Sequence, residues 1–248
     1  MLHITGLRKS YRKKLALDGV DLHVSKGRTV VLMGPSGCGK STLIRCLNRL
    51  TEPDAGSITL DGLDVTGLEH RDLLALRRRI GFVFQHFNLV RRLNALDNVS
   101  IGLRLHGMQR NEAEDRATRA LSLVGLSHKL LDFSAEMSGG EQQRVSIARA
   151  LALEPELMLW DEPTASLDPI LIGEVLEVME SLVASGRTTM IVVTHELSFA
   201  CRAADHVVLL DHGRIVEEGA PYKIFTNPIS EIGQKYKSLL KHLPEMVL

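Results

Sequence analysis

Nine consecutive residues constrain the fold of this chain more than any other stretch. Residues 34–42 read Gly-Pro-Ser-Gly-Cys-Gly-Lys-Ser-Thr and fit G-x-x-x-x-G-K-[ST], the pattern of a phosphate-binding loop. The apolar run 29–33 predicts a buried strand before the loop, and residues 43–47 predict a helix after it. This context of strand, loop and helix favours a phosphate-binding loop over an ordinary glycine turn.

The residue types of the loop suit a polyphosphate. Glycines at 34, 37 and 39 let the backbone turn its N–H groups inward, where they and the helix N-terminus attract phosphate oxygens. Lys40 places a positive charge near the β- and γ-phosphates, and the Ser41 hydroxyl can ligate Mg²⁺. The nucleotide-binding residues predicted here are Gly34, Pro35, Ser36, Gly37, Cys38, Gly39, Lys40, Ser41 and Thr42.

Length and charge limit the remaining possibilities. The 248 residues allow one large domain or one domain with an insert. The formal net charge is zero and the pI is about 7.2, so no overall basic field predicts nucleic-acid binding. No apolar run approaches the length of a membrane span, and residues 1–6 do not resemble a signal peptide.

The three cysteines, Cys38, Cys46 and Cys201, do not have the spacing of a metal site. Their odd number, without a secretion signal, predicts reduced thiols in the cytoplasm. Cys38 lies inside the loop, where backbone N–H groups can lower its pKa, but its small size favours a space-filling role.

Short strands are predicted on both sides of the loop. Residues 2–7, 20–24 and 57–61 cluster or alternate apolar side chains around turn signals, which is typical of an antiparallel sheet. Tyr11 lies between the first two of these strands. Its ring can either stack on an adenine or pack against its own sheet.

Residues 68–79 predict an amphipathic helix, whose basic end can be a solvated face. The run 80–84 then predicts a buried strand, and Gln85 follows it. A polar residue at the carboxyl end of a core strand lies where open α/β sheets bind ligands, although a solvated strand end is the alternative.

Helical patterns dominate from about residue 94 to residue 155, with no strand-like run between them. Asn111 with Glu114 fits an N-cap with an acid three residues on, and Gly125 can close that helix. A block of helices that interrupts an α/β core indicates an inserted helical subdomain.

Ser138 begins a segment with two possible roles. Ser138 and Glu141 fit a capping box for a helix that continues to about residue 153. Alternatively, Gly139 and Gly140 let a phosphate approach closely, and the segment is then a second anion site at a helix N-terminus. Spacing alone favours neither role.

Two adjacent carboxylates, Asp161 and Glu162, follow the apolar strand predicted at 157–160. They are costly at the end of a buried strand unless they have partners. Mg²⁺ near the Ser41 hydroxyl is the obvious partner for Asp161, and Glu162 can polarise a water for attack on the γ-phosphate. Two solvated acids at a strand exit are the alternative.

One further strand ends in a polar tip, over residues 189–195. His195 at this tip can face a nucleotide, although a lone histidine is usually structural. Residues 207–211 and 214–217 flank His212-Gly213 as a predicted β-hairpin. After about residue 225 the pattern indicates a polar helical tail without a chemical motif.

Taken in order, these motifs resemble the ATP-binding subunit of an ABC transporter, over nearly the whole chain. Residues 34–42 look like the Walker A loop, and residues 138–142 look like the ABC signature. Residues 157–162 look like Walker B with its catalytic glutamate, and residues 166–168 look like the D-loop. Met137, Glu141 and Trp160 depart from the residues usual in the family, and we expect all three to be tolerated.

The resemblance implies roles for individual residues. The catalytic group consists of Glu162, Gln85 of the Q-loop and the switch histidine His195. The magnesium ligands are Ser41, Gln85 and Asp161. Besides the loop, the ATP-binding residues are the adenine-stacking Tyr11 together with Ser138, Gly139, Gly140, Glu141 and Asp168.

The resemblance also implies an α/β fold: a P-loop NTPase core of mostly parallel strands with helices, an N-terminal antiparallel β-subdomain and an inserted α-helical subdomain. The core with its antiparallel β-subdomain is predicted at 1–86 and 156–225. The helical signature subdomain is predicted at 87–155, and a C-terminal helical tail at 226–248.

In this family two copies pair head to tail, with each ATP between one copy's Walker motifs and the other copy's signature. The implied cofactors are ATP and Mg²⁺. The implied partners are a second copy, transmembrane permease subunits and, indirectly, an extracytoplasmic solute-binding protein, with no nucleic acid. The implied location is the cytoplasmic face of the cell membrane.

The motifs around residues 45–48, 84–89 and 193–196 resemble the branch that takes up polar amino acids, whereas residues 90–93 look more like phosphonate importers. We favour amino acids. A non-transporting regulatory ABC ATPase at the membrane is a further alternative. If the chain were an ABC ATPase that acts on DNA, we would expect long heptad stretches between the Walker A loop and the signature. These stretches are absent from the sequence.

Overall fold

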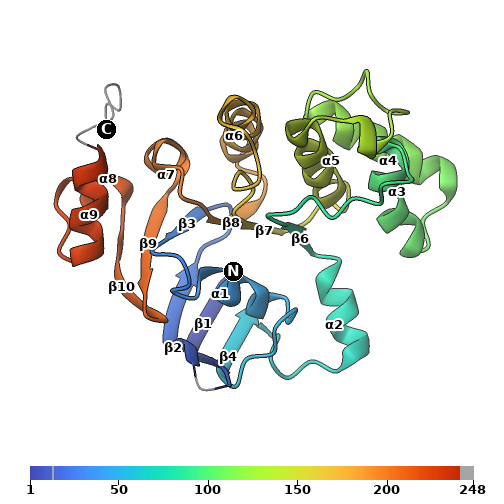
Figure 1. Ribbon diagram of the computed structural model, residues 1–248. Helices are drawn as coiled ribbons and strands as arrows, with labels where there is room; N and C mark the ends of the chain where they lie inside the picture. The colour runs from blue at the N-terminus through green and yellow to red at the C-terminus, as the bar shows by residue number, and fades with distance from the viewer. Residues whose placement is uncertain (13, 241–248) are drawn as a thin grey trace. The chain divides into compact units, whose positions relative to one another are not determined.

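The computed structural model describes residues 1–12 and 14–240, which form two compact units. Within the described part, the first unit runs over residues 1–77 and 186–240, and the second over residues 78–185. Figure 1 shows the elements of both. The functional boundaries predicted from the sequence stay predictions, and residues 241–248 of the predicted tail lie outside the described part.

The first unit contains an antiparallel sheet with the strand order β2-β1-β4-β5. Leu2 and Ile4 alternate with exposed residues, and Leu7 is buried after a shift in the register with which β1 pairs with β2. The three predicted strands are confirmed, and the structure extends the first two. The bounds are β1 (Leu2–Tyr11), β2 (Lys14–Val24), β4 (Ala55–Leu60) and β5 (Leu63–Asp64).

A second sheet in this unit holds the strand that leads into the phosphate-binding loop. β3 (Thr29–Met33) is buried along its whole length and pairs in parallel with both β8 (Thr189–Val193) and β9 (His206–Asp211). β10 (Arg214–Gly219) pairs antiparallel with β9. Between them His212 and Gly213 have φ values of 46° and 77°, as a two-residue hairpin requires, so the predicted hairpin is confirmed.

Five helices of the first unit are described: α1 (Lys40–Leu47), α2 (His70–Arg77), α7 (Leu197–Ala203), α8 (Pro221–Thr226) and α9 (Glu231–Leu240). The predicted helix 68–79 is therefore shorter at both ends. Its basic end is not only a solvated face. The Arg77 guanidinium donates to the carbonyls of Asn48 and Arg49, at 3.0 and 2.8 Å, and so ties α2 to the end of α1.

The second unit combines a parallel strand pair with helices. β6 (Ile80–Val83) pairs in parallel with β7 (Leu157–Asp161). The helices are α3 (Ala95–Leu105), α4 (Arg110–Leu123), a 3-10 helix (Ser134–Glu136), α5 (Gly139–Leu151) and α6 (Pro169–Ala184). In the fully described stretch 94–155 the one β feature is an isolated bridge between Asn94 and Phe133, which confirms the predicted helical block.

One predicted helix start is wrong. Asn111 is not an N-cap, because α4 begins at Arg110 after Gln109, whose carbonyl accepts from the Ala113 N–H at 2.9 Å. The Arg110 guanidinium bonds the Glu114 carboxylate at 2.6 Å, an i,i+4 pair that stabilises the earlier start. Gly125, with φ of 75°, follows the helix end as predicted.

The departures Met137 and Trp160 are both buried, so the fold has room for them. Within the described residues the Trp160 Nε1 has no hydrogen-bond partner. An unsatisfied buried donor of this kind costs about 1–3 kcal/mol.

Candidate functional site

The phosphate-binding loop has the backbone that its glycines predict. Gly34, Gly37 and Gly39 have φ values of 148°, 76° and 114°. A Cβ atom at Gly34 would lie 2.0 Å from the Leu210 carbonyl oxygen, and one at Gly39 would lie 2.4 Å from that of Ala16. The loop is therefore pressed against β9 and β2, and side chains at these two positions are excluded.

Lys40 is the first residue of α1 and is 4% exposed. Its ammonium donates to the carbonyls of Gly34 and Pro35, at 2.9 and 3.1 Å. The side chain thus folds back over its own loop, and no acidic residue occupies the first turn of α1. An ammonium beside the N–H groups of a helix start fits a phosphate group.

Cys38 behaves as a space-filling residue. It is buried, and burial raises the pKa of its thiol although the Lys40 ammonium lowers it. The thiol is therefore not activated. The Cys38 carbonyl accepts from the Gly213 N–H at 2.9 Å, which ties the loop to the β9–β10 turn.

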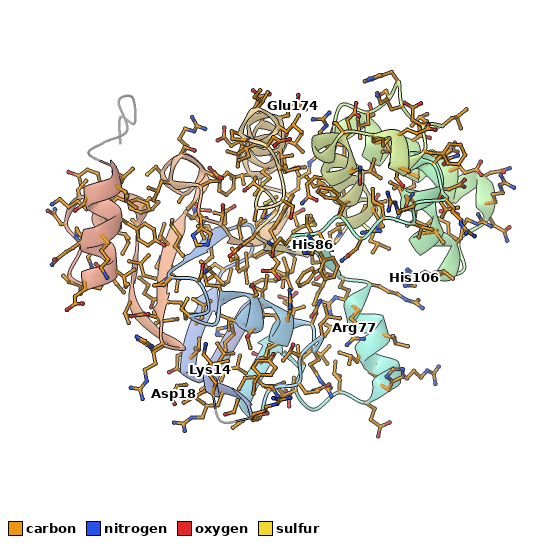
Figure 2. All side chains as sticks on the ribbon, in the orientation of Figure 1. Lys14, Asp18, Arg77, His86, His106 and Glu174 are labelled. Carbon is orange, nitrogen blue, oxygen red and sulfur yellow. The ribbon has the colours of Figure 1, made fainter. Side chains whose placement is uncertain are left out.

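A pocket of about 530 Å³ lies beside the loop in the first unit. It is lined by residues 35–38, by Lys14 of β2, by the turn 211–213 and by Lys235 of α9. Figure 2 labels Lys14 at the start of β2. The lining carries two lysines against one carboxylate, that of Asp211, and this excess of positive charge suits an anionic ligand.

Tyr11 and His195 both belong to the first unit. The Tyr11 ring is 48% exposed, and the ammonium of Lys9, in the same strand, lies 5.6 Å from its centroid. His195 is exposed and follows β8, the parallel neighbour of β3. Leu32 of β3 pairs with Val193 of β8, and the two strands are parallel. The phosphate-binding loop and His195 therefore both follow the carboxyl ends of neighbouring strands.

In the second unit, Ser138 caps α5 in the predicted capping box. Its hydroxyl accepts from the Glu141 N–H at 3.2 Å, and the Glu141 carboxylate accepts from the Ser138 N–H at 2.9 Å. Gly139 and Gly140 begin α5, and Ser138 itself is exposed. Capping and exposure occur together here, so the anion-binding role stays a prediction.

The Glu141 charge has a partner that the sequence did not reveal. The Lys129 ammonium lies 2.9 Å from the Glu141 carboxylate. Burial raises the pKa of Glu141, but Lys129 and the Ser138 N–H together hold that pKa below its usual value. The Glu141 carboxylate is therefore charged, and the Lys129 ammonium neutralises it locally.

The segment that contains Gln85 is held by α5, which sequence reasoning also missed. The Arg149 guanidinium donates to the carbonyls of Asn88 and Phe87 at 2.8 and 3.0 Å, and Gln143 donates to the Phe84 carbonyl at 3.3 Å. Gln85 itself is half-buried, two residues after β6. Nothing in the sequence of α5 indicates that Gln143 and Arg149 make these contacts.

His86 and Ser166 form another contact within this unit, with Nδ1 and Oγ 3.3 Å apart (Figure 2 labels His86). It links the residue after Gln85 to the predicted D-loop. Asp168 is the N-cap residue of α6, but its side chain makes no capping hydrogen bond and is exposed.

Asp161 is the last residue of β7 and Glu162 follows it, but the two residues differ in their environments. Asp161 is 1% exposed, whereas Glu162 is half-buried and has φ of 49°, a conformation uncommon outside glycine. Such backbone outliers cluster at functional sites. The described residues contain no cluster of three or more His, Cys, Asp or Glu that could hold a metal alone.

The predicted site residues thus fall into two groups. Tyr11, residues 34–42 and His195 lie in the first unit, whereas Gln85, residues 138–141, Asp161, Glu162 and Asp168 lie in the second. Within the described residues, no helix has the length and apolar character of a membrane span.

Comparisons with known proteins place the chain in a family. A family model described as ABC transporter matches residues 17–165. The glutamine transport ATP-binding protein of Geobacillus stearothermophilus is 43% identical over 98% of this chain and 100% of its own length. The methionine import ATP-binding protein of Brucella abortus is 42% identical over 97% of this chain, which spans only 65% of that relative.

The same fold occurs in a solved structure. The ATP-binding cassette MJ0796, described as a dimer bound to ADP and Pi after hydrolysis, has a TM-score of 0.81 and 33% identity. The match covers 89% of this chain and 99% of that one. The fold class predicted from the sequence is confirmed.

Proposed function

This chain belongs to the ABC transporter family, and we propose that it is the ATP-hydrolysing subunit of an importer for polar amino acids. The relatives described above are named for glutamine transport and for methionine import, which supports amino acids over phosphonate or another small anion. We place the subunit at the cytoplasmic face of the membrane, bound to permease subunits that receive solute from an extracytoplasmic binding protein.

The observation that carries this proposal is the geometry of the phosphate-binding loop. Three glycines with positive φ lead into a helix that begins at a buried lysine. The loop amides and the Lys40 ammonium supply donors for the β- and γ-phosphates of ATP. Tyr11, half-exposed, offers its ring to the adenine.

Hydrolysis needs a base and charge neutralisation. Glu162 accepts a proton from the water that attacks the γ-phosphorus, while the bond to the β–γ bridging oxygen breaks and ADP and phosphate form. Mg²⁺, for which Ser41, Asp161 and Gln85 are the proposed ligands, neutralises the phosphate oxygens when bound. Oxygen donors of this kind suit Mg²⁺, which usually binds one or two carboxylates plus substrate phosphates. His195 contacts the γ-phosphate.

We propose that two copies enclose ATP. Ser138, Gly139, Gly140 and Glu141 of one copy then contact the γ-phosphate bound by the other, beside Asp168. The exposure of Ser138 and Asp168 supports this role. Hydrolysis removes the bridge and lets the pair open.

A positively charged side chain at position 138 is expected to prevent the pairing of two copies without weakening the binding of ATP to each copy. Ser138→Arg places a bulky side chain at the start of α5, so the copies cannot close, while the loop of each copy still binds ATP. Ser122→Arg, near the end of α4, is the control and should pair normally. Both variants are measured in the Glu162→Gln background, where ATP stays intact. There Ser138→Arg should be a monomer in light scattering with ATP and should bind a fluorescent ATP analogue with unchanged affinity. Undiminished pairing of Ser138→Arg favours the capping role alone.

The Lys129–Glu141 pair gives a second, smaller prediction. Lys129→Ala leaves the Glu141 charge uncompensated near the γ-phosphate, so the ATP concentration for half-maximal pairing should rise about two- to fivefold. Adding Glu141→Gln should restore pairing, because glutamine keeps an acceptor for the Ser138 N–H. A defect that persists in the double variant contradicts the electrostatic explanation.

The proposed function is tested by copurification of the chain with its membrane partners and a substrate screen on the associated binding protein. Binding of polar amino acids, with ATP hydrolysis stimulated by the loaded binding protein, supports the proposal. Copurification with a membrane partner that moves no solute supports the regulatory alternative.

A further inference from the structure

The C-terminal helix contacts the phosphate-binding loop, contrary to the expectation that the tail carries no chemistry. The Tyr236 hydroxyl of α9 accepts a hydrogen bond from the Gly34 N–H at 3.0 Å. Gly34 is buried, and it is the first residue of the loop. Figure 1 shows α9 in red beside α8, near the end of the described chain.

α9 is anchored where it begins. The Glu217 carboxylate of β10 is 5% exposed and accepts from the N–H groups of Ile229 and Ser230, both at 2.9 Å, and from the Ser230 hydroxyl at 2.5 Å. The Ser230 hydroxyl in turn accepts from the Gly233 N–H at 3.0 Å. A Cβ atom at Gly233 would lie 2.5 Å from that of Pro228, so the helix start is closely packed.

Tyr236 and Lys40 both form hydrogen bonds with Gly34. The Gly34 N–H points to the tyrosine, while the Gly34 carbonyl accepts from the Lys40 ammonium at 2.9 Å. Because a Cβ atom has no space at Gly34, the backbone there has little freedom to rearrange. The tyrosine hydroxyl therefore holds the peptide between Met33 and Gly34, which adjoins the Gly34 carbonyl that accepts from the lysine.

A second residue of α9 also faces the loop. Lys235 lines the 530 Å³ pocket together with Ser36 and Gly37 of the loop, and Ile232 lies in the same lining. α9 thus contributes a hydrogen bond to one side of the loop and a cation to the pocket beside it. Burial raises the pKa of Tyr236, so its phenol stays neutral.

We propose that Tyr236 is a positioning residue for ATP, which holds the first glycine of the phosphate-binding loop and sets the affinity of the loop for nucleotide. The inference rests on the proposed function, because it presumes that the loop binds ATP. A segment or partner that shifts α9 then changes ATP affinity.

The test is Tyr236→Phe, which keeps the ring and removes only the hydroxyl. Loss of the acceptor leaves a buried N–H unsatisfied in the loop, so the KM for ATP and the Kd for trinitrophenyl-ATP should rise about three- to tenfold. The kcat at saturating ATP should stay within about twofold, since the hydroxyl does not touch the reacting atoms. Tyr222→Phe, at a tyrosine of α8 that is 64% exposed, is the matched control.

Each outcome decides one point. Unchanged Kd in Tyr236→Phe, with binding lost in Lys40→Ala, overturns the inference and leaves the proposed function standing. A lower melting temperature with unchanged Kd assigns Tyr236 a structural role and also overturns it. Absence of ATP binding by the unaltered chain overturns the proposed function itself. Ser230→Ala, which loosens the start of α9, should raise Kd in the same direction as Tyr236→Phe.

Discussion

Glu162→Gln is expected to bind ATP with nearly unchanged affinity and to lose hydrolysis about a hundredfold or more, because general-base catalysis contributes on that scale. The amide keeps the size of the carboxylate but cannot accept the proton of the attacking water. ATP then stays intact, so the variant should also accumulate as a dimer. Phosphate release and light scattering measure the two effects.

The control for this prediction is Glu177→Gln, which removes an exposed carboxylate of α6 by the same chemical change. It should hydrolyse ATP at the normal rate. Glu162 differs by its position directly after β7 and by its φ of 49°. Unimpaired turnover of Glu162→Gln would remove the assignment of the base and leave the strained backbone unexplained.

Lys40→Ala is expected to weaken ATP binding about tenfold to a hundredfold. A charge-assisted hydrogen bond contributes about 1.5–3 kcal/mol, and each 1.4 kcal/mol is a factor of ten in Kd. The variant also loses the two hydrogen bonds from the ammonium to the Gly34 and Pro35 carbonyls. Equilibrium titration with a fluorescent ATP analogue measures the change.

Lys26→Ala serves as the control for this second prediction, because Lys26 is exposed in the turn between β2 and β3. Its ATP affinity should match that of the unaltered chain. If Lys40→Ala also kept its affinity, the loop would not be the phosphate site, whatever its backbone geometry.

The sequence predicts well those features that depend on neighbouring residues. The loop at 34–42, the buried strand before it and the hairpin around His212 each follow from local residue types, and the structure has all three. The capping box of Ser138 is likewise local, since its two partners are three residues apart. In each case the physical constraint lies within a few peptide bonds.

Contacts between distant residues were not predictable in the same way. Tyr236 meets Gly34 across 202 positions, and a tyrosine in a polar helix carries no signal of such a contact. Lys129 likewise lies in an ordinary connection, although it neutralises Glu141. α4 starts two residues earlier than predicted, with Gln109 and not Asn111 as its N-cap residue, and the surface pair of Arg110 with Glu114 accompanies that earlier start.

In the proposed mechanism ATP joins two copies of this chain, held by the phosphate-binding loop of one and the Ser138 segment of the other. The direct test of this mechanism is a crystal structure of Glu162→Gln with ATP and Mg²⁺. In the pair, the Oγ atom of Ser138 of the partner subunit should lie within about 3 Å of a γ-phosphate oxygen. An assembled pair with intact ATP in which Ser138 faces bulk solvent would contradict it.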